Sequence, residues 1–160
     1  MNDREDRLAY DRLRLPFLVV AGFAAGLIWQ LLVTPGHGPP VAPVIKLLRN
    51  GGHAFLFAIL TWPLLSGLPN PLAWRVPAVV ITAGYAIATE WFQQNLPGRL
   101  ASIGDVVIDC SGILLGWALV QWTQARPGGR RRVTPRVLAA GTLCFVLASF
   151  ETLRNLLATS

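Results

Sequence analysis

The sequence predicts an all-α membrane protein, a polytopic helical bundle with five transmembrane helices. Of its 160 residues, 53% are hydrophobic and only 14% are charged, and the mean hydropathy is +0.49. An average soluble domain carries about 25% charged residues. The apolar residues gather in runs of about 20, which is the length that crosses a bilayer. Short segments rich in Pro, Gly and Arg separate the runs, so we expect short loops and no separate soluble domain.

The first half of the chain contains two of the expected spans. Residues 1–14 are polar and form a cytoplasmic segment, and the first span at 15–34 resembles an uncleaved signal anchor, because its apolar run is too long for a signal peptide. A Pro/Gly-rich loop, TPGHGPPVAP, and a short amphipathic piece at 44–49 follow. The second span covers 51–68, with a kink expected at Pro63.

The second half contains three more spans. The third covers 74–94 and the fourth 103–122, so a membrane domain extends over 15–122. A basic cytoplasmic linker is expected at 123–136, in which Thr134 and Pro135 supply the cap and first turn of the last span. That span and a short tail occupy 137–160.

The distribution of basic residues predicts the orientation. With the N-terminus in the cytoplasm, ten of the fourteen basic residues fall on the cytoplasmic side, and a bias of this size over short loops is a strong positive-inside signal. We therefore expect the N-terminus inside, the C-terminus outside, and no nucleic-acid partner for the positive charge. The four basic residues expected outside are Lys46, Arg49, Arg99 and Arg154.

Three carboxylates stand out from this apolar background. Between Asp11 and Glu151 the only acidic residues are Glu90, Asp105 and Asp109. Ionisable residues within membrane spans are costly, so they are functional candidates by default. In the predicted topology they share the outer end of the bundle with other polar residues. The candidate binding residues are His53, Glu90, Gln93, Arg99, Ser102, Asp105 and Asp109.

Helical spacing groups these residues on shared faces. Asp105 and Asp109 are four residues apart, and Gly112 and Gly116 continue the same stripe. Glycines at this spacing let another helix approach closely, so the carboxylates are expected to point into the bundle. The Gly22/Gly26 pair has the same spacing and serves a contact within one chain or between chains, so the oligomeric state stays open.

Structural roles compete with functional ones at several positions. Glu90 either pairs with Arg99 and ties the third span to its loop, or binds a ligand. Ser102 and Asp105 have the spacing of a capping box, which would stabilise the fourth span. Asp109 lies deeper and has no such role, so a functional one is favoured. His53 is either a capping or interfacial residue or part of the site.

Three other features are expected to be structural. Glu151 and Arg154 have the spacing of a surface ion pair at the outer end of the last span. His37, in the Pro/Gly-rich loop, is expected to be solvated. Cys110 and Cys144 have neither metal spacing nor a framework partner, and are expected to be small core residues.

The chemistry of the cluster leaves binding and catalysis open. Histidine with carboxylates suits general acid–base work, with Glu90, Asp109 and His53 as the catalytic candidates. No nucleophile motif is present, and Ser102 and Ser111 are the only nearby hydroxyls that could serve as a nucleophile. The same residues could ligate a divalent ion, but no metal-binding spacing occurs and Arg99 competes for the acids. We expect no metal and no other cofactor.

The polar motifs resemble those of the VanZ-like family of small bacterial membrane proteins. The resemblance rests on a histidine that opens a helix, EWFQ, PGR, a serine, and DVVID followed by two glycines, and it covers residues 50–116. Asp109 stands where the family usually has asparagine, and Asn50 and Phe57 replace a lysine and a tyrosine. The resemblance implies a four-helix core with one added C-terminal span, in a bacterial cytoplasmic (inner) membrane.

The resemblance implies a role in the cell envelope and an association with teicoplanin resistance. The first hypothesis is a binding protein, with a membrane lipid, a lipid-linked envelope precursor, a glycopeptide-like molecule or a partner protein as the ligand. The second is an interfacial hydrolase or transferase that acts on a lipid-linked substrate. Proton-coupled transport is disfavoured, because the acids are confined to one end of the bundle.

Overall fold

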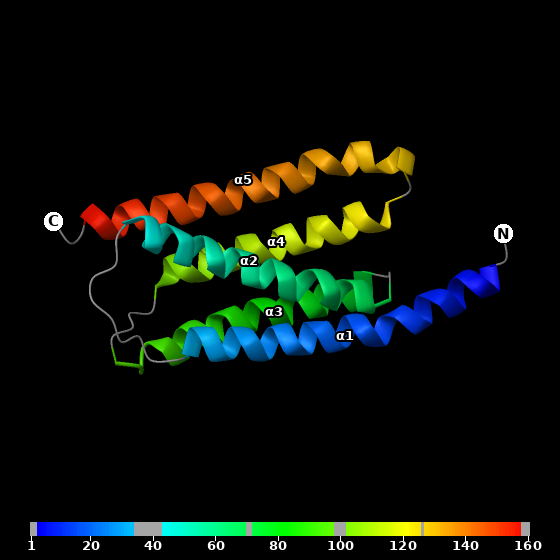
Figure 1. Cartoon of the computed structure of the whole chain (residues 1–160), viewed down its shortest axis with the longest axis horizontal. Coiled ribbons are helices and arrows are strands. Elements are labelled where there is room, and N and C mark those ends of the chain that lie inside the picture. Colours follow the sequence, from blue (N-terminus) through cyan, green and yellow to red (C-terminus); the bar gives the residue numbers. More distant parts are fainter. Residues whose placement is uncertain (1–2, 34–42, 70–71, 98–101, 126, 158–160) are drawn as a thin grey trace.

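The computed structural model describes residues 3–33, 43–69, 72–97, 102–125 and 127–157. The described helices run back and forth along one long axis, and the two ends of the chain lie at opposite ends of the molecule (Figure 1). The described residues contain no strand, so the predicted all-α membrane bundle is confirmed. The helices are α1 (Asp3–Val33), α2 (Pro43–Gly67), α3 (Leu72–Gln93), α4 (Ile103–Gln124) and α5 (Pro127–Leu157).

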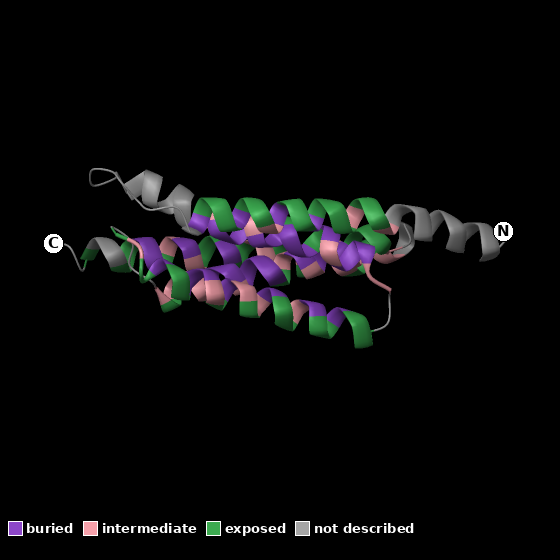
Figure 2. Ribbon diagram, turned by 90° about the horizontal axis from the view of Figure 1, so that it is seen from below, coloured by how far each residue is buried: buried purple, intermediate pink, exposed green. Residues whose placement is uncertain are grey.

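Four helices contain a stretch that is long and apolar enough to cross a membrane: Arg14–Leu32, Leu72–Gln93, Ile103–Gln124 and Gly129–Arg154. The apolar part of α2, Gly51–Gly67, is shorter. This helix contacts each of the other four, so it lies inside the bundle. Figure 2 shows buried residues turned toward the interior and exposed ones on the outer faces. Large hydrophobic side chains such as Phe23, Ile81 and Phe145 are exposed there, which suits a surface that faces lipid.

Three predicted boundaries differ from the structure because the helices extend beyond the apolar runs. The head at residues 3–14 continues into α1, and the amphipathic piece at 44–49 is the start of α2. The expected linker is largely helical, since α5 begins at Pro127. Proline is well tolerated in a first turn, where its missing N–H has no helical partner. Thr134 is therefore not a cap, and its hydroxyl donates to the Arg130 carbonyl inside the helix.

The glycine stripe of α4 brings α2 and α4 into close contact. A Cβ atom at Gly112 would overlap the carbonyl oxygen of Ala54, and one at Gly116 would lie 2.7 Å from the Cβ of Thr61. Only glycine permits this separation, as the sequence predicts. By contrast, Gly22 and Gly26 are exposed and have open space around them.

A hydrophobic core joins the first four helices. Phe57 and Ile28 are fully buried at its centre, and tyrosine at 85 packs against it while its hydroxyl donates to the Ala25 carbonyl at 2.7 Å. A smaller cluster ties in α5 through Cys144, which contacts Ala54 and Ile108. Cys144 is the small core residue that the sequence predicts, whereas Cys110 is half-buried; both are free thiols.

Candidate functional site

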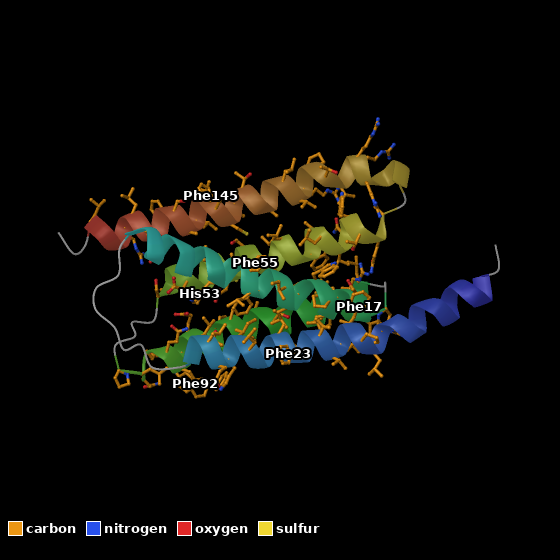
Figure 3. All side chains as sticks on the ribbon, in the orientation of Figure 1. Phe17, Phe23, His53, Phe55, Phe92 and Phe145 are labelled. Atoms are coloured by element: carbon orange, nitrogen blue, oxygen red, sulfur yellow. The ribbon has the colours of Figure 1, made fainter. Side chains whose placement is uncertain are left out.

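The rare polar residues of α2, α3 and α4 lie at one end of the bundle. Because the helices alternate in direction, the first turns of α4 lie at the same end as the last turns of α3 and α5 (Figure 1). His53 lies toward this end on α2 (Figure 3). The predicted convergence is confirmed by distance: ligand atoms of His53, Glu90 and Asp109 all lie within 4.8 Å of one another. We refer to these three residues as the buried cluster.

The buried cluster is closed off from solvent. His53 and Glu90 are each 4% exposed, and Asp109 is 0% exposed. Nδ1 of His53 lies 3.3 Å from Oδ1 of Asp109, which is ion-pair distance, but the two groups are not aligned for a hydrogen bond. The alternative that His53 is a helix cap is wrong, because α2 begins ten residues earlier, at Pro43.

Several buried polar atoms at this end have no hydrogen-bond partner among the described residues. They include Oε1 of Glu90, both carboxylate oxygens of Asp109, Nδ1 of His53 and Nε2 of Gln93. Gln93 is 2% exposed and lies one turn beyond Glu90 on α3. Buried polar groups are nearly always satisfied in folded proteins, so this concentration of unsatisfied atoms needs an explanation.

Ser102 connects the buried cluster to the start of α4. It is the N-cap residue: its Oγ accepts a hydrogen bond from the Gly104 amide at 3.1 Å. The Ser102 amide donates to Oε2 of Glu90 at 3.1 Å. In a capping box this amide would be bound by the acid at position 105, so the cap is completed from α3 instead. Asp105 is half-buried in the first turn of α4, where its negative charge is favourable.

Glu151 belongs to the same end of the bundle, and its predicted place on the surface is wrong. It pairs with Arg154 as predicted, yet Glu151 is only 3% exposed, whereas the Arg154 side chain is 54% exposed. Its Oε1 accepts from the Ser102 hydroxyl at 3.0 Å, and its carboxylate rests on Gly104. The spacing of Glu151 and Arg154 predicted their ion pair, but it could not predict that Glu151 packs against the start of α4. Glu151 falls within the expected last span, and an acidic residue inside a span is expected to face other helices.

The remaining candidates divide into two groups. Ser111 is buried and its hydroxyl donates to the Ile108 carbonyl at 2.6 Å, so this hydroxyl has a structural bond. Arg99, the predicted partner of the acids, and His37 both lie outside the described residues.

An apolar groove of about 500 Å³ lies beside this end, between α2, α4 and α5. Its walls include Gly51, Gly52 and Ala54, which flank His53 along α2. On α5 the lining runs from Gly141 to Ala148, one turn short of Glu151. Seven residues of helix span roughly 10 Å, so the groove reaches from the polar end toward the middle of the bundle.

The fold and the site together define a helical membrane protein with a buried ionisable cluster at one end of its bundle. A family model described as VanZ/LLP1 matches residues 3–124, which is more than half of the chain. The chain therefore belongs to the VanZ/LLP1 family, and the resemblance seen in the sequence is confirmed. The match ends at the last residue of α4, so α5 lies beyond it. Searches of curated proteins and of solved structures found no match.

Proposed function

We propose that this VanZ-family protein binds an anionic membrane amphiphile, a phospholipid or a lipid-linked envelope precursor, at the polar end of its bundle. The observation that carries the proposal is the continuity between the apolar groove and that end. Beyond Ala148, the residues Glu151 and Arg154 follow on α5 at steps of three, so they extend the groove-lining face. An acyl chain in the groove places its head group beside Arg154 and Ser102.

The polar residues at this end suit a charged head group. The guanidinium of Arg154 is exposed and lies 3.4 Å from Oγ of Ser102. Glu90 holds the Ser102 amide, which links the head-group position to the buried cluster. Arg99 follows α3 in the sequence but lies outside the described residues. Arg154 and Ser102 are thus the head-group contacts in the proposal, and Glu90 acts on them through the Ser102 amide.

Filling the groove tests the proposal. A Cβ atom at Gly141 meets nothing within 4 Å, and Gly141 lines the groove, so we expect the side chain of Gly141→Leu to occupy part of the groove. We expect native mass spectrometry of the purified protein to show a retained lipid in the wild type and a loss of at least ~10-fold in Gly141→Leu, since each buried CH₂ is worth about 0.8 kcal/mol.

Gly84→Leu is the matched control, because Gly84 is exposed, has equal room and lies on α3, away from the groove. Equal lipid retention in Gly141→Leu and the wild type contradicts the proposal. Teicoplanin susceptibility that changes with expression of the wild type, but not of Gly141→Leu, would connect the same groove to resistance.

A second candidate function, an enzyme that acts on the head group, is favoured by the His53–Asp109 pair. A histidine held 3.3 Å from a buried carboxylate is the arrangement of a base and the group that orients it. The two functions separate in Glu90→Gln and Asp109→Asn. A binding protein loses part of its lipid in these variants, whereas an enzyme keeps its substrate bound and loses turnover.

We also propose that the polar end faces the outside of the cytoplasmic membrane. The proposal is supported by arginines at the opposite end: Arg75 donates to Gln124 at 2.6 Å, and Arg136 to Gln121 at 3.2 Å. Lys and Arg collect on the cytoplasmic side of membrane proteins.

Reporter fusions measure this orientation. A green fluorescent protein fused after Arg132 is expected to fluoresce, and alkaline phosphatase at the same place to be inactive. Fusions after Ser160 are expected to behave in the opposite way. Phosphatase activity after Arg132 would reverse the assignment.

A further inference from the structure

The buried cluster has more unsatisfied acceptors than a folded interior tolerates. Two carboxylates and an imidazole are at least 96% buried, and Oε1 of Glu90, both oxygens of Asp109 and Nδ1 of His53 have no hydrogen-bond partner among the described residues. Within the described part of the chain, the Glu90 carboxylate accepts only from the Ser102 amide, and Asp109 has only the ion-pair contact with His53. A buried carboxylate is costly unless it is both paired and hydrogen-bonded. These atoms come from three different helices and point toward one small volume. A cation in that volume would be bound by one atom from each of the three residues.

We propose that His53, Glu90 and Asp109 bind a divalent transition-metal ion of the zinc class. Four-coordinate zinc binds nitrogen and oxygen ligands at about 2.0–2.2 Å, which puts neighbouring ligand atoms about 3.4 Å apart. The His53–Asp109 separation of 3.3 Å already has this value. All ligand atoms of the cluster lie within 4.8 Å of one another. Side-chain movements of roughly 1.4 Å would therefore bring the most distant pair to the separation found around zinc.

The ligand types select the class of metal. One imidazole nitrogen with two carboxylate oxygens suits zinc or a neighbouring transition metal, whereas Mg²⁺ and Ca²⁺ prefer oxygen ligands alone. Three protein ligands leave a fourth position open, as in zinc sites that bind an exchangeable molecule. The burial of the cluster closes it to a bulky head group.

A second layer of contacts fixes the orientation of one ligand. Oε2 of Glu90 accepts the Ser102 amide at 3.1 Å, which leaves Oε1 directed to the metal. Hydrogen bonds of this kind orient metal ligands and raise affinity. Ser102 also contacts Glu151 and Arg154, where the proposed head group lies. The inference therefore rests on the proposed function in one respect: the metal supplies the positive charge that lets an anionic head group approach two carboxylates.

Metal titration tests the inference on the full-length protein. After treatment with a chelator, the purified wild type is titrated with Zn²⁺ in a calorimeter, and we expect one equivalent to bind. Asp109→Asn and His53→Ala are expected to weaken binding by at least ~10-fold, since loss of even a supporting group costs 10–100-fold. His37→Ala, which removes the other of the two histidines in the sequence, is the matched control and is expected to bind Zn²⁺ as the wild type does.

The visible absorption spectrum of the Co²⁺-loaded wild type tests the inference without any variant, so the result does not depend on whether the variants fold. Co²⁺ added to the metal-free wild type is expected to give the intense visible absorption of a four-coordinate site, and Zn²⁺ is expected to displace it. The inference is overturned if the wild type takes up no Zn²⁺, if Asp109→Asn binds as tightly, or if uptake appears only in Arg99→Ala, which would make Arg99 the counter-charge. Lipid retention by a wild-type protein that takes up no Zn²⁺ would leave the proposed function intact while this inference fails.

Discussion

Gly112→Ala is expected to destabilise the folded bundle by about 1–3 kcal/mol, the usual cost of inserting a methyl group into a well-packed interface. The added Cβ atom would overlap the carbonyl oxygen of Ala54 on α2, and that atom is backbone, which cannot rotate away. The helices must then separate at the level of the buried cluster. Thermal unfolding of the detergent-purified protein, followed by circular dichroism, measures the effect as a lower Tm.

Gly26→Ala is the matched control for this substitution. It makes the same chemical change within a helix, at an exposed position where a Cβ atom meets nothing within 4 Å. We expect its Tm to equal or slightly exceed that of the wild type, because alanine favours a helix by up to about 1 kcal/mol relative to glycine. Equal melting of the two variants would contradict the close contact between α2 and α4.

The effect of Gly112→Ala should extend to the site. Ala54 follows His53 directly in α2, and Gly112 lies three residues beyond Asp109 in α4. Separating the helices at this contact therefore moves two members of the buried cluster apart. A variant that loses both stability and bound ligand, while Gly26→Ala keeps both, would connect the packing of the helices to the function of the site.

The helices and their shared faces were predictable because they depend on local order in the chain. Runs of apolar residues predicted the number of helices, and the spacing of Asp109 and Gly112 predicted which face of α4 is buried. Alternating helix direction then placed His53, Glu90 and Asp109 at one end. The ends of the helices were less predictable, since α1 and α5 continue through polar residues whose helical state does not depend on hydrophobicity.

Contacts between helices could not be predicted from one sequence. Nothing in the spacing shows that the Ser102 amide binds Glu90 from α3 or that its hydroxyl binds Glu151 from α5. A metal site was not expected for a similar reason, because its residues would come from different helices. Spacing motifs detect ligands that share one helix or loop, whereas the three proposed ligands lie on α2, α3 and α4.

The central claim is that α2, α3 and α4 bring His53, Glu90 and Asp109 together, and cysteine cross-linking in native membranes tests it. With Cys110 and Cys144 replaced by alanine, cysteines are introduced at 53 and 109, or at 53 and 90. A protease site placed between Leu68 and Leu72 separates the fragment that carries position 53 from the fragment that carries the other two. A short membrane-permeant thiol cross-linker should then keep the fragments joined.

The pair at 55 and 109 is the matched control, because Phe55 lies on the same helix but is 63% exposed. We expect both site pairs to be joined nearly completely under conditions in which the control pair stays largely cleaved into fragments. Cross-linking of the site pairs that is no faster than that of the control would show that these side chains do not meet, and the proposed site would have to be abandoned.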